Sequence, residues 1–589
     1  MLKNFLEQAA NDKCVYITDV REAFQAEGKR PFHIHVTLYD RSVRAFDLRL
    51  PETAGEDEER FVAEYVYANV YNLLSSLGGL RIDVYLDPAD QAALVLARGL
   101  DRVFQLDRAK AERTGYGKCL NVNERILAAL FGETERFSFT VRDVKDEPAA
   151  EPPKPVTGKP VFDSLPDRTR GKMVLGMDIG GTDVKLAVSV DGQLALCKEF
   201  DWFPASYALA EEITGPLLLL TRTLRAAGSL YRAGRPDQID RTALGKHATL
   251  AEMERGAEEM ERSAGADLCR FDAIGLCFPD VVIQNRIVGG ETHKTHGLRD
   301  NPNLDYEEQF AKITALNADL AAYVVPGGPV MNTNDGPMAA FAAAVEQAAG
   351  GGDVSCGFFA HTLGTELGSG WVRPDGSIPE IPLEVYNFII DLGSYAQRGY
   401  VSDDVRSVNN VNTALPGTLQ RYTSQSGVFR LAAKYLPEQA PEVLQEAVDK
   451  GLFRREGDML VVPAQPEDMR KPCLEFFMQK AAAGQPVCQE IFREVGEYLA
   501  VTWRETGYVL RPETGDRTLF GRFVKLPECF RLMCEGAARR EPELRQYAAD
   551  SGLANTLLMK QLDAHPDYTV AQFAQAVGAI YYGCLGLKA

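Results

Sequence analysis

The sequence has no long run of apolar residues. Its apolar runs, such as Leu217 to Leu220, are far shorter than the roughly 20 residues that a membrane-spanning helix needs. The N-terminus also lacks the charged and then apolar leader of a secreted protein. We therefore expect a cytoplasmic protein with no membrane partner.

Positive charge is scarce relative to negative charge. The chain has 64 lysines and arginines against 83 aspartates and glutamates, which gives a formal net charge of −19. Nucleic acids and anionic membranes bind proteins that present positive surface. The charge balance therefore argues against a nucleic-acid partner.

Paired cysteines are also missing. The 11 cysteines are scattered, and none forms a CxxC pair. This spacing gives no sign of a disulfide framework or a structural zinc site. We expect reduced and mostly buried thiols.

What is present begins with length, because 589 residues predict two to four domains. Residues 1–142 are expected to form a small α/β domain of open function. Apolar residues alternate in Phe32–Leu38 and again in Phe46–Leu50, which predicts a hairpin. A helix over Glu58–Leu77 and a short strand near Val103–Leu106 are also expected.

A proline-rich stretch separates this domain from the rest of the chain. Residues 143–172 combine prolines with many charges, as linkers do. Beyond this linker we expect two lobes, residues 173–350 and 351–589.

The first lobe opens with a strand, a tight turn and a second strand, MVLGMDIGGTDVKLAVSVDG. Gly180 and Gly181 allow the backbone to approach a ligand closely, and exposed N–H groups beside the Thr182 hydroxyl suit phosphate oxygens. Asp178 at the strand end suits a hydrated magnesium ion. An ordinary hairpin with a Gly-Gly turn is the alternative.

Polar residues that suit a hydroxylated substrate follow later strands. Asn334 and Asp335 lie between a short strand and an alanine-rich helix. Asp335 could accept a proton from a substrate hydroxyl while Asn334 holds neighbouring hydroxyls, or it could be a helix N-cap only. The segment GETHKTHG, with Glu291 and His293, suits sugar hydroxyls, with a solvated loop as the equal alternative.

The glycine turn then recurs. Cys356–His361 predicts a strand, Thr362–Gly370 is a glycine-rich turn, and Trp371 begins the strand that leaves it. The two turns lie about 185 residues apart and each opens an α/β half. This arrangement indicates two related lobes that face one nucleotide.

These residues resemble the sugar kinases of the ROK (repressor, open reading frame, kinase) group, in the actin, hexokinase and Hsp70 superfamily. The resemblance runs from about Met173 to Leu587. It is carried by MDIGGTDVK, NTNDGPMAA, LGTELGSGWV, PLEVYNFIID and TLFGRFVK, which look like the first phosphate loop, the catalytic Asn-Asp segment, the second phosphate loop, the sugar-contacting stretch and the adenosine loop.

The resemblance implies a two-lobed, actin/hexokinase-like (ribonuclease H-like) α/β fold and ATP-dependent phosphorylation of a sugar hydroxyl. Asp335 would be the general base, and Asp178 would hold Mg²⁺ through water. The sugar-binding residues would be Asn334, Glu384 and Asn387, with Glu291 and His293 as further candidates. The ATP-binding residues would be Asp178, Gly180, Gly181, Thr182, Lys185, Gly364, Thr365 and Gly521.

The sequence departs from the family at several positions. Asn387 stands where the family has a zinc-binding histidine, and residues 394–416 contain no cysteine, so no zinc is expected. Glu366 stands where the second phosphate loop has glycine, and Arg522 replaces a glycine of the adenosine loop. Glu366 and Asp183 would either repel phosphate or bring in a second cation.

A non-catalytic regulator or scaffold that binds sugar or nucleotide and retains the ROK fold is the alternative function. Family repressors have a basic helix-turn-helix domain at the N-terminus, whereas this N-terminal region reads as strand-rich and the chain is acidic. The sugar, the phosphorylated hydroxyl and the oligomeric state, homo-oligomers included, are left open.

Overall fold

The computed structural model describes residues 1–132, 134–149, 161–289, 295–397, 399–549 and 553–587. The chain divides into two compact units that each draw on distant parts of the sequence. Unit 1 contains Met1–Pro155, His361–Ser369 and Ile381–Ala548. Unit 2 contains Val156–Ala360, Gly370–Glu380 and Ala549–Ala589. The predicted boundaries of a domain at 1–142, a linker at 143–172 and lobes at 173–350 and 351–589 stay predictions.

Unit 2 is built around a five-stranded sheet with the order β11-β8-β5-β6-β7. Its strands are β5 (Met173–Ile179), β6 (Asp183–Val190), β7 (Gln193–Asp201), β8 (Ala273–Phe278) and β11 (Val330–Asn334). β5, β6 and β7 pair antiparallel, whereas β8 runs parallel to β5 and β11 parallel to β8. The carboxyl ends of β5, β8 and β11 therefore lie at one edge of the sheet.

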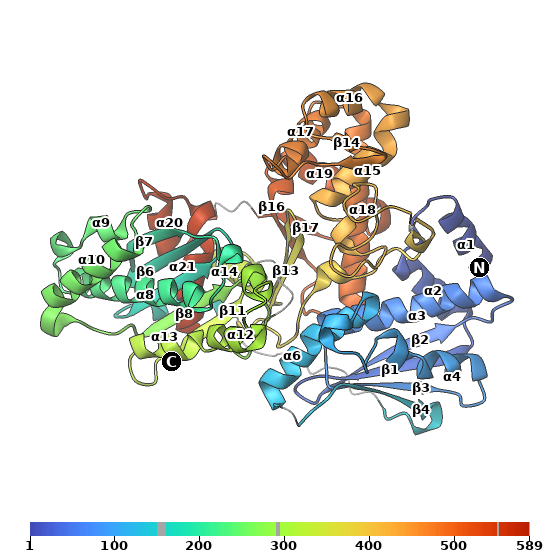
Figure 1. Cartoon of the computed structure of the whole chain (residues 1–589), viewed down its shortest axis with the longest axis horizontal. Helices are drawn as coiled ribbons and strands as arrows, with labels where there is room; N and C mark the ends of the chain where they lie inside the picture. The colour runs from blue at the N-terminus through green and yellow to red at the C-terminus, as the bar shows by residue number, and fades with distance from the viewer. Residues whose placement is uncertain (133, 150–160, 290–294, 398, 550–552, 588–589) are drawn as a thin grey trace. The chain divides into compact units, whose positions relative to one another are not determined.

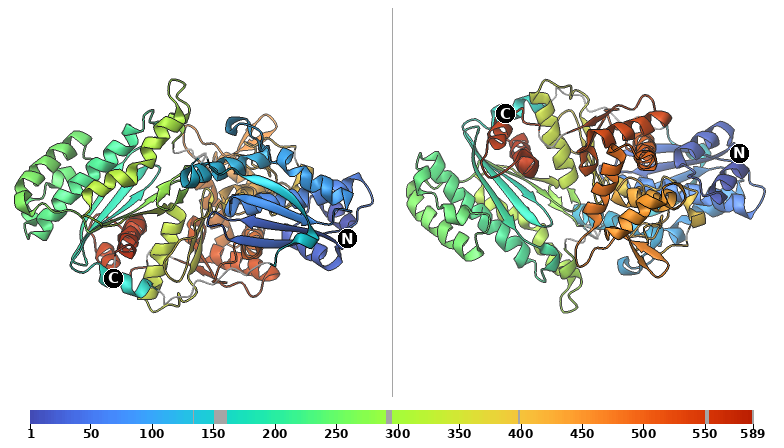
Figure 2. Two further views of the ribbon diagram at one scale, coloured as in Figure 1. Left: turned by 90° about the horizontal axis from the view of Figure 1, so that it is seen from below. Right: turned by 90° about the horizontal axis from the view of Figure 1, so that it is seen from above.

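Helices cover both faces of this sheet (Figures 1 and 2). The long helices α8 (Glu211–Arg232) and α10 (Leu250–Ala264) lie on one face, and α21 (Val570–Leu585) lies on the other, where α14 (Asp335–Ala349) packs against it. Unit 2 also contains α7 (Leu165–Arg168), α9 (Arg241–Leu244), β9 (Val282–Ile283), β10 (Arg286–Ile287), α11 (His296–Arg299), α12 (Tyr306–Thr314), α13 (Leu316–Leu320) and α20 (Leu557–Asp563).

The core of unit 2 explains why these elements form. Alternate strand residues such as Leu175 and Leu186 are fully buried against apolar residues of α8 such as Leu217 and Leu224. Gly176 allows close contact on the opposite face, because a Cβ there would collide with the backbone of α21. The burial of this sheet on both faces fixes the strand ends that form the candidate site.

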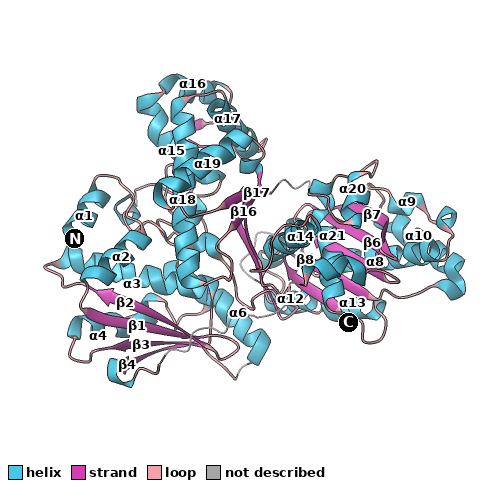
Figure 3. Cartoon of the chain, turned by 180° about the vertical axis from the view of Figure 1, so that it is seen from behind, coloured by secondary structure: helices cyan, strands magenta, loops and turns pink. Residues whose placement is uncertain are grey.

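The N-terminal part of unit 1 is a second sheet, with the order β2-β1-β3-β4 (Figure 3). Its strands are β1 (Arg30–Thr37), β2 (Val43–Leu50), β3 (Arg81–Leu86) and β4 (Ser138–Asp143). The predicted hairpin is β1 with β2, and Phe32 and Ile34 of β1 are fully buried. The predicted long helix is α3 (Glu56–Ser76), which lies with α2 (Ile17–Glu27) over one sheet face. The strand predicted near Val103–Leu106 is wrong, because α5 (Leu100–Val103) and a turn occupy these residues.

A third sheet, with the order β13-β12-β16-β17, includes the second glycine turn. It is formed by β12 (Phe358–Leu363), β13 (Leu367–Val372), β16 (Arg517–Gly521) and β17 (Gln546–Ala548). The long helices of unit 1 are α15 (Gln425–Gln439), α17 (Arg470–Ala482), α18 (Pro486–Val509) and α19 (Pro527–Arg540). Unit 1 also contains α1 (Leu2–Ala10), α4 (Gln91–Arg98), α6 (Cys119–Phe131), α16 (Pro441–Asp449), β14 (Arg454–Glu456) and β15 (Met459–Val461).

The predicted α/β fold class is confirmed. The order and directions of the five strands in unit 2 are those of a ribonuclease H-like sheet, with an antiparallel strand beside the first strand and two parallel strands on its other side. Within the described part of the chain, no helix is both long enough and apolar enough to cross a membrane.

Candidate functional site

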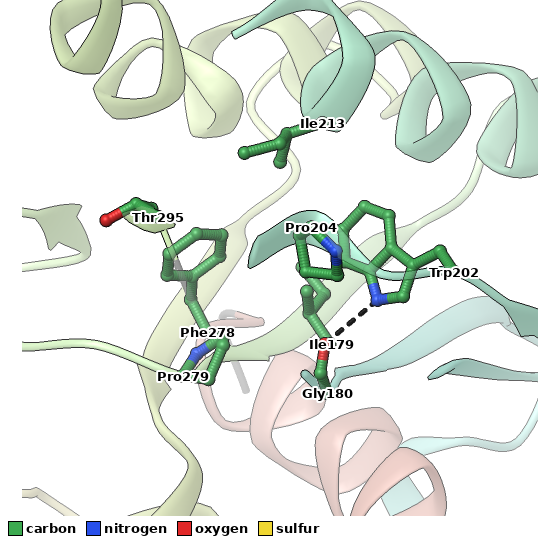
Figure 4. Close-up of a pocket in the computed structure, with 8 residues that line it drawn as sticks. All are labelled: Ile179, Gly180, Trp202, Pro204, Ile213, Phe278, Pro279 and Thr295. Carbon is green, nitrogen blue, oxygen red and sulfur yellow. Dashed lines mark hydrogen bonds between the residues drawn. The ribbon is translucent and has the colours of Figure 1, made fainter. Parts of the chain in front are cut away.

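The first glycine turn lies between β5 and β6, as the sequence predicts. Gly180 donates a backbone hydrogen bond to the carbonyl oxygen of Asp183 over 2.8 Å, which closes the turn. Trp202 then holds the turn from outside: its indole N–H donates to the carbonyl oxygen of Gly180 over 2.9 Å, and its backbone N–H donates to Thr182 over 3.0 Å (Figure 4). The Lys185 ammonium pairs with the Asp183 carboxylate. The turn is therefore fixed before any ligand binds.

Asp178 is the carboxylate at the end of β5. The Cys277 thiol donates to its Oδ1 over 3.2 Å. Burial raises the pKa of Asp178 to about 6, and the nearby charges of Asp335 and Asp183 add to this effect, while Cys277 and Lys185 oppose it. A divalent cation would stabilise the charged form of such a carboxylate, so the donor fits a magnesium ion.

Asp335 is the first residue of α14, and its neighbour Asn334 is the N-cap. Asn334 Oδ1 accepts from Gly336 N over 3.0 Å, and its Nδ2 donates to the carbonyl oxygen of Asp280 over 2.7 Å. The N-cap role considered for Asp335 thus belongs to Asn334. The same Gly336 N–H lies 2.9 Å from Asp335 Oδ1, which orients the half-buried Asp335 carboxylate.

Strand register explains why these residues lie together. Asp178 is opposite Cys277, Cys277 is opposite Thr333, and Phe278 is opposite Asn334. Because the three strands run parallel, Asp178, Asn334 and Asp335 lie at the same carboxyl edge as the glycine turn. Ligands of α/β sheets bind at such edges.

A small apolar pocket opens beside the glycine turn (Figure 4). Its volume is about 270 Å³, including the part that is open to solvent. Its lining residues are Ile179, Gly180, Trp202, Pro204, Ile213, Phe278, Pro279 and Thr295. No sequence pattern points to Trp202, because only the fold brings this residue from the end of β7 to the turn.

The second glycine turn lies between β12 and β13. Gly364 donates to the carbonyl oxygen of Glu366 over 3.2 Å and accepts from Gln425 N over 2.9 Å. Thr365 and Glu366 are exposed. Gly521 ends the neighbouring strand β16 with a φ of +93°, and a Cβ there would collide with the Leu363 carbonyl group. The structure therefore brings Gly364, Thr365 and Gly521 to one end of this sheet.

Glu366 and Arg522, the two residues that stand where the family pattern has glycine, both have side-chain partners within unit 1. Loss of surrounding water raises the pKa of Glu366 to about 7, although the residue as a whole is exposed. The charge of Arg421 and a hydrogen bond from Gln420 Nε2, 3.2 Å from Glu366 Oε1, only partly offset this rise. Arg522 pairs with Glu475, with 3.2 Å between Nη1 and Oε1.

The predicted sugar-binding residues of unit 1 lie near this second turn. Burial raises the pKa of Tyr386 well above its ordinary value, and the charges of Glu384 and Glu366 add to the rise, so both carboxylates lie near this phenol. Asn387 Oδ1 accepts from Asn410 Nδ2 over 3.2 Å. Asn387 thus has an amide partner.

Two predicted site residues, Glu291 and His293, lie outside the described residues. The other predicted residues fall into two groups. Asp178, Gly180, Gly181, Thr182, Lys185, Asn334 and Asp335 belong to unit 2, whereas Gly364, Thr365, Glu384, Asn387 and Gly521 belong to unit 1. The combination of both groups in one site stays a prediction. Among the residues that the structure describes, no group of three or more histidines, cysteines, aspartates or glutamates is placed to hold a metal ion.

Comparison with known proteins gives matches among solved structures only. No family model matches the sequence, and no curated protein is detectably similar to it. A ROK family protein from Streptococcus pneumoniae in complex with sucrose is 14% identical over 70% of this chain and 97% of its own, with a TM-score of 0.36. A ROK family glucokinase from Streptomyces griseus in complex with glucose and AMPPNP is 17% identical over 66% and 97%, with a TM-score of 0.35. A ROK hexokinase from Thermus thermophilus is 16% identical over 66% and 96%, with a TM-score of 0.34. The chain is thus similar to ROK-family sugar kinases of known structure.

Proposed function

We propose that the protein transfers a phosphoryl group from ATP to a hydroxyl group of a sugar or sugar derivative. The observation that carries this proposal is the carboxyl edge of the sheet in unit 2. There Asp335 lies near enough to Asp178 for its charge to affect the pKa of Asp178, and β5 leads directly into the glycine turn. A base, a magnesium-binding carboxylate and a phosphate-binding turn are what phosphoryl transfer to an alcohol requires.

Asp335 would act as the general base. Its carboxylate would accept the proton of the sugar hydroxyl as that oxygen attacks the γ-phosphate. Gly336 N–H orients this carboxylate. An amide group has two N–H donors, and Asn334 uses one of them on the Asp280 carbonyl oxygen, so the second would bind a neighbouring sugar hydroxyl.

Other residues would position the nucleotide. Backbone N–H groups of the first turn and the Thr182 hydroxyl would donate to phosphate oxygens. Asp178 would hold Mg²⁺ through water, and this ion supplies charge neutralisation when it is bound with ATP. Lys185 is already paired with Asp183, so it would contribute less charge than a lone lysine. From unit 1, we assign Gly364, Thr365 and Gly521 to ATP and Glu384 and Asn387 to the sugar.

A panel of hexoses, amino sugars and polyols in a coupled ADP-release assay tests the proposal. We expect at least one compound to raise ADP release, and Asp335→Asn to lower that rate by about 100-fold or more, because base catalysis contributes roughly 10²–10⁴. Asp240→Asn is the matched control, since Asp240 is also a carboxylate at a helix N-terminus, that of α9. Equal rates in the parent protein and Asp335→Asn would exclude this role.

A second candidate function is a non-catalytic sugar- or nucleotide-binding regulator. Glu366 favours it, because an acidic residue stands in the turn assigned to phosphate. Calorimetric binding of ATP or a sugar, without turnover of any compound in the panel, would support this candidate over the kinase.

A further inference from the structure

The N-terminal part of unit 1 contacts the segment that contains Glu384 and Asn387. We call residues 383–392 the sugar segment. Hydrogen bonds reach it from two N-terminal elements, the end of α3 and the chain just before α2. Both elements belong to the region whose function the sequence leaves open.

The C-terminal end of α3 holds the start of the sugar segment. Leu383 N–H donates to the carbonyl oxygen of Ser76 over 3.1 Å, and Glu384 N–H donates to that of Ser75 over 3.3 Å. Carbonyl groups in the last turn of a helix have no partner within the helix. The N–H groups of Leu383 and Glu384 supply partners for two of these carbonyl groups. Glu384 is one of the residues assigned to the sugar.

The backbone at Leu383 is in the left-handed region, with a φ of +56°. Residues with a side chain adopt this region rarely, and such conformations persist only where surrounding structure fixes them. The hydrogen bonds from Leu383 and Glu384 to α3 are part of that surrounding structure. The backbone next to Glu384 is thus held by α3 against its local preference.

Asn72 makes the most specific contact. This fully buried residue of α3 pairs with the backbone of Ile389 through both ends of its amide. Its Oδ1 accepts from Ile389 N over 2.8 Å, and its Nδ2 donates to Ile389 O over 3.1 Å. Nδ2 also donates to Glu505 Oε1 over 2.9 Å, and Glu505 pairs with Arg21. Every polar atom of the Asn72 side chain is therefore used in this contact.

The chain before α2 holds the other end of the segment. Ile17 N donates to Ile390 O over 2.9 Å, and Leu392 N donates to Val15 O over 2.8 Å, as in a short antiparallel pair. Val15 N donates to Asp391 Oδ1 over 2.8 Å. Figure 1 shows α2 and α3 between the N-terminal sheet and α18. The contact between the N-terminal region and the sugar segment is therefore part of the packed interior of unit 1.

We propose that the N-terminal region positions the sugar segment, and that Asn72 is its principal positioning residue. By fixing the backbone on both sides of Glu384 and Asn387, the region presents these side chains to the sugar in one arrangement. The reference to a sugar rests on the proposed function, whereas the positioning of the segment rests on the hydrogen bonds themselves.

Asn72→Ala in the full-length chain tests this proposal, with Asn69→Ala as the matched control. Asn69 lies one turn earlier on α3 and is equally buried, but its partners are Arg21 Nη2 at 2.7 Å and the carbonyl oxygen of Tyr65 at 2.8 Å. Both variants lose a buried amide, and only Asn72→Ala loses contacts with the sugar segment. If the alanine variants fail to fold, Asn72→Ser and Asn69→Ser take their place.

The first readout is hydrogen exchange, which needs no activity. We expect amides of residues 383–392 to exchange about tenfold or more faster in Asn72→Ala than in Asn69→Ala, because only the first variant frees the Ile389 backbone for local opening. Equal exchange of this segment in the two variants would overturn the proposal.

The second readout is kinetic. We expect the KM for the sugar to rise about tenfold in Asn72→Ala, because this variant loses hydrogen bonds that fix a binding segment. The KM for ATP should change little. In Asn69→Ala neither KM should change. Faster exchange with an unchanged sugar KM would overturn the positioning role and leave the kinase proposal standing. If the parent shows no sugar turnover, the proposed function fails, and hydrogen exchange alone decides whether the region holds the segment.

Discussion

Asp178 and Asp335 are carboxylates from two different elements of unit 2, and the charge of Asp335 raises the pKa of Asp178. Burial is the larger influence on Asp178, and it raises the pKa of this residue to about 6. The Cys277 thiol beside it stays protonated, since burial and the two carboxylates raise the pKa of Cys277 well above its ordinary value. The pair therefore costs folding free energy unless a cation is bound.

Asp178→Asn tests this cost through the pH dependence of stability. The folded-state pKa of about 6 lies above the ordinary aspartate value of 3.8, so the unfolding free energy of the parent falls as pH rises between these values and stays low above pH 6. Without Mg²⁺, we expect the variant to be more stable than the parent at pH 8 by about 1–2 kcal/mol, or a few °C in Tm. Calorimetry at pH 4 should show no gain, and a gain of the same size at both pH values would contradict this interpretation.

Glu366 gives a second prediction at this scale. With a pKa of about 7 it is mostly charged at pH 8 and mostly neutral at pH 6. If it repels phosphate, Glu366→Gln should tighten ATP binding at pH 8 by about fivefold, or about 1 kcal/mol, and much less at pH 6. Isothermal titration calorimetry checks this difference. Weaker ATP binding by the variant would instead show that Glu366 acts through a second cation.

At the scale of elements, strand ends and turns determine where the candidate site residues lie. β5, β8 and β11 end at one edge, and α14 begins there, so local structure delivers Asp178, Asn334 and Asp335 together. In unit 1, the left-handed Gly521 lets β16 approach the end of β12. Both arrangements depend on backbone geometry more than on any one side-chain contact.

Gly521→Ala tests the close approach of β16 to β12. The Cβ would meet the Leu363 carbonyl group, and the residue would also be strained at a φ of +93°. We expect a loss of more than about 2 kcal/mol in unfolding free energy and weaker ATP binding, measured by denaturant unfolding and calorimetry. Gly451→Ala is the control, because Gly451 has a φ of +70° with open space around it and should lose about 1 kcal/mol.

Local patterns in the sequence predicted elements well where one periodicity was strong. The alternation in Phe32–Leu50 predicted β1 and β2, and the glycines at 180 and 181 predicted the turn after β5. The strand expected near Val103–Leu106 is wrong because the apolar Leu100 and Phe104, both fully buried, are spaced for a helical turn instead. A short apolar run cannot distinguish these cases.

At the scale of the whole molecule, the sequence could not show which distant segments fold together. Met1–Pro155 clusters with Ile381–Ala548 in one unit, although more than 200 residues separate these segments in the sequence. Contacts such as Asn72 with Ile389 join residues more than 300 positions apart, and no local pattern encodes them. The same holds for Trp202, whose bond to Gly180 depends on the order of strands in the sheet.

The central claim is that the protein transfers a phosphoryl group from ATP to a sugar hydroxyl. Mass spectrometry of the sugar after incubation with ATP and Mg²⁺ tests this claim most directly. We predict that the parent protein forms a sugar monophosphate and that Asp335→Asn forms it at least about 100-fold more slowly. The kinase proposal would be contradicted if no sugar in the panel gained a phosphoryl group, or if Asp335→Asn formed the product as fast as the parent.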